Sequence, residues 1–130
     1  MSRLVLNQKN NFLNRLNETV PWEEFRPILE QVRQKPRKSN AGRKPFDVVL
    51  MFKLLILQKL YNLGDEQLEY QVNDRLSFMA FLELSLTDAV PDGTTVWLFR
   101  QQLTDAGLIE ALFEQFESYL IAQGYPAHGR

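Results

Sequence analysis

The stretch from Asp47 to Asn62 constrains the fold more than any other part of the chain. A helix that is apolar on nearly all sides is enclosed by other elements, whereas a surface helix shows one apolar stripe. The run is interrupted by Lys53 and is too short for the roughly 20 residues that span a bilayer. We therefore expect a central core helix over 47–62, capped by Asp47 and ended by Gly64. Its apolar residues are Val48, Val49, Leu50, Met51, Phe52, Leu54, Leu55, Ile56, Leu57, Leu60 and Tyr61.

Shorter segments with helical periodicity flank this helix, and no segment has the pattern of a strand. We expect a helix that opens at Pro21, one over 75–83 capped by Asp74, and one over 94–104 started by Asp92 or Thr94. The further helices are expected at about 7–17, 66–73 and 107–123. In the helix over 94–104, the residues predicted to face inward are Val96, Trp97, Phe99 and Leu103. The predicted fold is all-α: a compact bundle of about five to six short helices with a helix-turn-helix-like portion.

The chain divides by charge, although its net charge is only −1. Residues 1–60 hold 12 Lys or Arg and 5 Asp or Glu, whereas residues 61–130 hold 3 and 11. Two prolines, a glycine and a serine break regular structure between the second and third helices. We expect an N-terminal helical segment (1–34), a basic linker (35–45), a helical domain (46–124) and a frayed C-terminal tail (125–130).

The first candidate binding site is the basic linker together with Arg33, which lies just before it. A cationic segment held open by proline can follow a phosphate backbone, and such contacts give affinity without sequence information. Three alternatives stay open: a solvated connector, attraction between the two halves of the chain, and attraction to a neighbouring chain. The candidate DNA-binding residues are Arg33, Lys35, Arg37, Lys38, Arg43 and Lys44.

The helix after Pro91 is the second candidate. Thr94, Thr95 and Arg100 lie on it with Gln101 and Gln102, and these side chains suit bases and phosphates. An ordinary polar face on a core helix explains the same pattern equally well.

The scarcity of catalytic residue types argues against catalysis by this chain. The chain has no Cys and a single His, His128, which excludes disulfides, thiol catalysis and zinc fingers. Asp88 and Asp92 share a loop, where such residues are more often turn and cap formers than metal ligands. We expect no catalytic or metal-binding residues, no cofactor and no small-molecule substrate. The N-terminus lacks the apolar stretch of a secretory signal, so a soluble cytoplasmic protein is expected.

Several ordered motifs over about residues 20–124 carry a family resemblance. The chain is similar to the N-terminal (InsH-like) domain of IS5-type insertion-sequence transposases. Pro21-Trp22 before a helix also fits that family. The other motifs are Gly42-Arg43-Lys44-Pro45-Phe46-Asp47, the run 50–58, Tyr61-Asn62-Leu63-Gly64-Asp65, Asp74-Arg75-Leu76-Ser77-Phe78, Phe81-Leu82, Leu84-Ser85-Leu86, Pro91-Asp92-Gly93-Thr94-Thr95 and Phe99-Arg100.

The resemblance implies a DNA-binding region that acts in DNA transposition and recombination by recognising transposon terminal repeats. In the family this region precedes an RNase H-like domain with an Asp-Asp-Glu metal triad. The chain is expected to stop short of that domain, as a truncated transposase in which no residue inherits a catalytic role. Expected partners are DNA and, as an open alternative, a second copy in a homodimer. The alternative function is a helical oligomerisation or protein-interaction domain without DNA binding.

Overall fold

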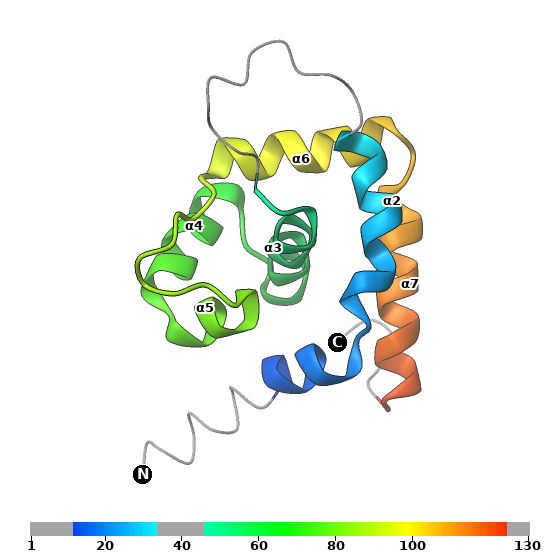
Figure 1. The fold of residues 1–130 in the computed structure, drawn as a ribbon, viewed down its shortest axis with the longest axis horizontal. Coiled ribbons are helices and arrows are strands. Elements are labelled where there is room, and N and C mark those ends of the chain that lie inside the picture. The colour runs from blue at the N-terminus through cyan, green and yellow to red at the C-terminus, as the bar shows by residue number, and fades with distance from the viewer. Residues whose placement is uncertain (1–11, 34–45, 125–130) are drawn as a thin grey trace.

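A computed structural model describes residues 12–33 and 46–124, and these ranges contain helices and no strands (Figure 1). The predicted all-α class is therefore confirmed, with slightly more helices than expected. Within the described ranges, no helix is both long and apolar enough to cross a membrane. The elements are a helix over 12–19, η1 (Trp22–Phe25), α2 (Arg26–Glu30), η2 (Gln31–Arg33), α3 (Val48–Tyr61), α4 (Asp65–Asp74), α5 (Leu76–Leu82), α6 (Gly93–Asp105) and α7 (Ile109–Ala122).

Helix α3 occupies the centre of the bundle, as its sequence predicts. Figure 1 views α3 nearly end-on, with α6 across the top, α4 and α5 on one side and α2 and α7 on the other. Every residue of α3 from Met51 to Leu57 is buried. Asp47 caps the helix as predicted, because its Oδ2 accepts hydrogen bonds from Val49 N at 3.1 Å and Leu50 N at 3.3 Å.

Two of the residues predicted to end or cap helices are wrong, although the predicted range of the central helix, 47–62, agrees with the structure. Helix α3 closes at Asn62, whose φ of 56° is left-handed, and Gly64 is instead the N-cap of α4. Asparagine adopts this conformation more readily than most residues, so glycine is not required there. Asp74 is the last residue of α4, and Arg75 occupies the N-cap of α5.

The segment from Trp22 to Arg33 is less regular than the single helix its apolar spacing predicts. It runs as a 3-10 turn, a short α-helix and a second 3-10 turn, with Pro27 in the first turn of α2. Proline has no backbone N–H to continue an α-helical hydrogen-bond ladder, which is consistent with the change of helix type before it. Trp22, Phe25 and Leu29 are nevertheless buried against the core.

Lys53 is the one polar side chain in the core of the described residues, with only 5% of its surface exposed. Its ammonium donates to Phe81 O at 2.9 Å and lies 5.1 Å from the ring centre of Trp22 and 5.0 Å from that of Phe81. Asn17 Nδ2 donates to the same carbonyl at 3.0 Å. Both donors satisfy a carbonyl of the last turn of α5, which has no partner within its own helix.

Candidate nucleic-acid interface

Charge is distributed very unevenly between the described helices and the rest of the chain. All 16 Asp and Glu residues lie within 12–33 and 46–124, together with only seven of the 15 Lys and Arg residues. This helical body therefore carries a formal charge of −9. The other eight cations lie in the remaining ranges, which contain no acidic residue. A polyanion is therefore repelled by the helical body and attracted by the cations outside it.

Most of the predicted DNA-binding residues fall outside the described ranges. Arg33 is the last residue of η2, and its backbone alone is described. The five candidates of the basic linker, which come between η2 and α3 in the sequence, lie outside the described residues. They are Lys35, Arg37, Lys38, Arg43 and Lys44.

Several cations of the helical body bind carboxylates of the same body. Arg26 lies 2.6 Å from Glu23 Oε1 of η1 and 2.7 Å from Asp47 Oδ1, and the contact with Asp47 joins α2 to the start of α3. Lys59 lies 3.8 Å from Glu117 Oε2 and so joins α3 to α7. Neutralised in this way, Arg26 and Lys59 add little positive potential for phosphate.

Arg100, a predicted DNA contact, joins three helices in the structure. Its Nη1 and Nη2 donate to Asp65 Oδ1 at 3.0 Å and Oδ2 at 2.9 Å, and Nη1 also donates to Gln58 Oε1 at 2.8 Å. The hydrogen bonds that Asp65 accepts from Arg100, and one from Gln58, hold the pKa of Asp65 below its usual value, so the carboxylate stays charged. A bidentate pair of this kind fixes geometry as well as adding energy. Arg100 therefore has a structural role between α3, α4 and α6.

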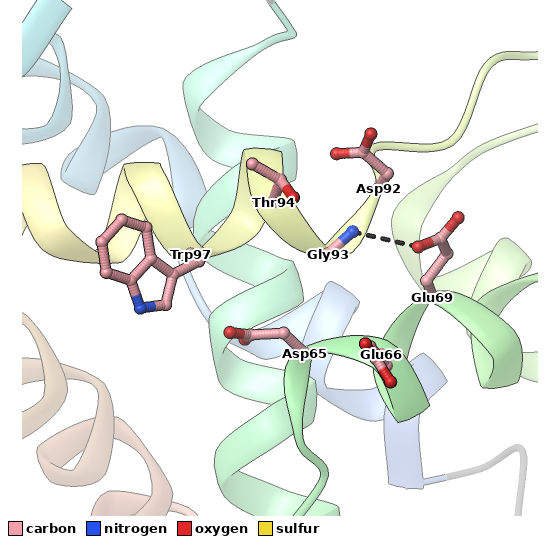
Figure 2. Close-up of a pocket in the computed structure, with 7 residues that line it drawn as sticks. All are labelled: Asp65, Glu66, Glu69, Asp92, Gly93, Thr94 and Trp97. Carbon is pink, nitrogen blue, oxygen red and sulfur yellow. Dashed lines mark hydrogen bonds between the residues drawn. The ribbon is translucent and has the colours of Figure 1, made fainter.

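Thr94 lies in the first turn of α6 beside a group of carboxylates (Figure 2), and Thr95 follows it in the same helix. Asp92 Oδ1 accepts from Thr95 N at 2.8 Å, which confirms the predicted start of the helix, and Glu69 Oε1 accepts from Gly93 N at 3.0 Å. A helix N-terminus can bind an anion through such N–H groups. Here protein carboxylates already fill that role, so phosphate has little to gain at this end of α6.

A cavity of about 490 Å³ opens at the same place, lined by Asp65, Glu66, Glu69, Asp92, Gly93, Thr94 and Trp97. The inward orientation predicted for Trp97 is wrong: the residue is 47% exposed and borders this cavity (Figure 2). The inward face of α6 is formed by Val96, Phe99 and Leu103 at three- and four-residue spacing, and Trp97 lies beside that stripe rather than in it.

Asp88 and Asp92, weighed as metal ligands, act as turn and cap residues. Asp88 Oδ2 accepts from Ser85 N at 2.8 Å within the loop before α6. Across 12–33 and 46–124, no group of three or more His, Cys, Asp or Glu side chains is placed to hold a metal ion.

Sequence motifs that lie far apart in the chain meet at one junction between α3, α4 and α6. Asn62 closes α3, Asp65 opens α4 and binds Arg100 of α6, and Gly93 packs directly against Asp65. A Cβ added at Gly93 would lie 3.2 Å from Asp65 O, tighter than ordinary contact. The only signal available in the sequence was the repeated presence of Gly-Asp and Asp-Gly at helix starts.

The described residues form a small all-helical body with a buried central helix and a formal charge of −9. The chain belongs to the transposase domain family DUF772, whose model matches residues 2–102. No solved structure matches the chain. Membership of this family places the matched region in a transposase and implies a role in transposition and interaction with DNA.

Proposed function

We propose that this chain is the DNA-binding N-terminal region of an IS5-type transposase and recognises transposon terminal repeats. Its role is to bind DNA, whereas strand cleavage belongs to an Asp-Asp-Glu catalytic domain. The basic segment from Lys35 to Lys44, which follows Arg33 at the end of η2, supplies the affinity through phosphate contacts.

The segregation of charge is the observation that carries this proposal. The helical body has a balance of −9, and the basic segment contributes five cations between Lys35 and Lys44 without any acidic residue. Because phosphate is repelled by the body and attracted by the segment, the segment is the favoured contact. The carboxylates around Thr94 and the engagement of Arg100 with Asp65 also favour the segment over α6 as the anchor.

Gel-shift titration with terminal-repeat DNA and a shuffled duplex of equal length tests this function. We expect the terminal repeat to bind more tightly, because base contacts add to a phosphate term that both duplexes share. Single variants Arg37→Ala and Arg75→Ala form a matched pair, since each removes one arginine. Arg37→Ala should weaken binding to both duplexes, and Arg75→Ala, on the helical body, should weaken binding less.

The same titration separates the proposal from the alternative of a protein-interaction domain. Unchanged mobility of both duplexes at low salt would exclude DNA binding. A self-association that persists at high salt, without any DNA shift, would favour the alternative.

A further inference from the structure

A second cavity, of about 620 Å³, opens where the start of α3 meets the end of α5 and the segment that leads into η1. It shares no lining residue with the cavity at the start of α6, and the proposed DNA contacts do not use it. Its volume lies within the range of small-molecule sites. We call it the Lys53 cavity, after the buried lysine in its wall. Its lining includes Asn17, Trp22, Leu50, Lys53, Leu82 and Glu83.

Three side chains of the Lys53 cavity have unused hydrogen-bonding capacity. Within the described residues, the Lys53 ammonium makes one hydrogen bond, to Phe81 O at 2.9 Å. Glu83 Oε2, at 3.9 Å, forms an ion pair with the ammonium but is too distant for a hydrogen bond. Trp22 Nε1 and Asn17 Oδ1 are buried and have no hydrogen-bond partner among the described residues. Because buried polar groups are nearly always satisfied, these atoms indicate a missing partner.

The charges around the Lys53 cavity decide which class of ligand fits. Its lining contains two cations, Arg26 and Lys53, and three anions, Glu23, Asp47 and Glu83. Arg26 is already held by Glu23 and Asp47. An anion placed at Lys53 would be repelled by Glu83 and by the acidic body, and a cation would be repelled by Lys53 itself. An uncharged ligand avoids both costs.

We propose that the Lys53 cavity binds a small uncharged molecule that carries an amide group. The amide oxygen has two lone pairs, which match the two unused donors, Lys53 Nζ and Trp22 Nε1. The ammonium lies 5.1 Å from the ring centre of Trp22, so both donors belong to the same part of the cavity. The amide N–H suits the unpartnered acceptor, Asn17 Oδ1, and the apolar part of the ligand packs against Leu50 and Leu82. This site does not depend on the proposed DNA binding.

NMR spectra of the indole N–H groups, recorded without DNA, test this site. The chain has two tryptophans, Trp22 and Trp97, and the variant Trp97→Phe assigns their two cross-peaks. Benzamide and benzoate are the probes, because they have nearly the same shape and differ in charge. Benzamide at millimolar concentration should shift the Trp22 cross-peak saturably and leave that of Trp97 in place. Benzoate should bind about tenfold more weakly, because Glu83 and the acidic body repel it.

Two pairs of variants separate the hydrogen bond from the charge. Lys53→Met should abolish the saturable shift with benzamide, and Lys59→Met, at a more exposed position of the same helix, should retain it. Glu83→Gln changes an exposed side chain and keeps Lys53, so it tests the cavity even if Lys53→Met does not fold. Glu83→Gln should tighten benzoate binding about fivefold, whereas Glu110→Gln on α7 should leave it unchanged.

Several results would overturn the proposal. A Trp22 cross-peak that neither probe moves would leave water as the partner of the buried polar atoms. Tighter binding of benzoate than of benzamide would exclude an uncharged ligand. Equal shifts of the Trp22 and Trp97 cross-peaks would show that the probe has no specific site. A folded Lys53→Met with the benzamide affinity of the wild type, or a Glu83→Gln with its benzoate affinity, would contradict the roles of these two side chains.

Discussion

Single side chains connect helices that lie far apart in the sequence. Arg100 of α6 binds Asp65 at the start of α4 and Gln58 near the end of α3, so three helices meet at one guanidinium. Both charged side chains are less than one third exposed, at 31% and 23%. Partial burial reduces screening by solvent, and this pair is therefore worth more than an exposed one.

Asp65→Asn should lower the free energy of unfolding at pH 7 by about 1–3 kcal/mol, because charged hydrogen bonds to Arg100 are lost. The pKa of Asp65 is lowered in the folded state, so its contribution is present above the unfolded value of 3.8 and is lost as the pH falls further. Urea unfolding at pH 7 and pH 3 measures this. The gap between wild type and variant should narrow at pH 3, and the exposed Glu66→Gln serves as the control. A difference in stability between wild type and Asp65→Asn that does not change with pH would contradict the lowered pKa of Asp65.

Lys53 gives a pH dependence of the same direction as Asp65, but in the alkaline range. Burial lowers its pKa below the usual 10.5, so the unfolded chain holds the proton more tightly than the folded chain. The contribution of Lys53 to the free energy of unfolding should therefore rise as the pH increases from below its lowered pKa through 10.5. Urea midpoints across that range, compared between wild type and Lys53→Met, isolate this residue. Lys59→Met, a more exposed position of the same helix, is the control. Urea midpoints of wild type and Lys53→Met that change in parallel with pH would contradict the prediction.

At the scale of elements, the close approach of α4 and α6 shapes the molecule. Gly93 in the first turn of α6 lies against the backbone of Asp65, and its N–H donates to Glu69 of α4. The starts of the two helices abut, and carboxylates compensate the positive ends of both helix dipoles. The acidic character of this surface follows from how the helices pack.

Gly93→Ala should destabilise the fold by about 1–3 kcal/mol, because the added Cβ meets Asp65 O at 3.2 Å and backbone there cannot move freely. Gly64→Ala is the matched control: its Cβ would have no atom within 4 Å, and its φ of −74° suits alanine. Thermal or urea unfolding of both variants measures the difference. Equal stability of the two variants would show that the α4–α6 contact is not tight.

Local patterns in the sequence predicted the helices better than they predicted the contacts between helices. The apolar circumference of α3 and its Asp47 cap were predictable because both depend on neighbouring residues. That Asn62 rather than Gly64 takes the left-handed position at the end of α3 was not predictable, since asparagine and glycine compete for it. The exposure of Trp97 depends on which neighbours cover α6, and the partner of Arg100 is 35 positions away. No periodicity within a helix encodes such a distant contact.

The whole molecule separates its charges into a compact acidic body and basic segments outside the described helices. A net charge of −1 conceals this separation and, by itself, argues against a nucleic-acid partner. Family membership and the charge of the body support our proposal that the basic segment anchors DNA.

The salt dependence of DNA affinity tests this account most directly. Fluorescence anisotropy should give a plot of log affinity against log salt with a slope of about −4 to −5, as expected if five cations each neutralise a phosphate. Changing Lys35, Arg37, Lys38, Arg43 and Lys44 to Ala should abolish most of that slope and most of the affinity. A five-alanine variant with the affinity and slope of the wild type would contradict the claim that the basic segment anchors DNA.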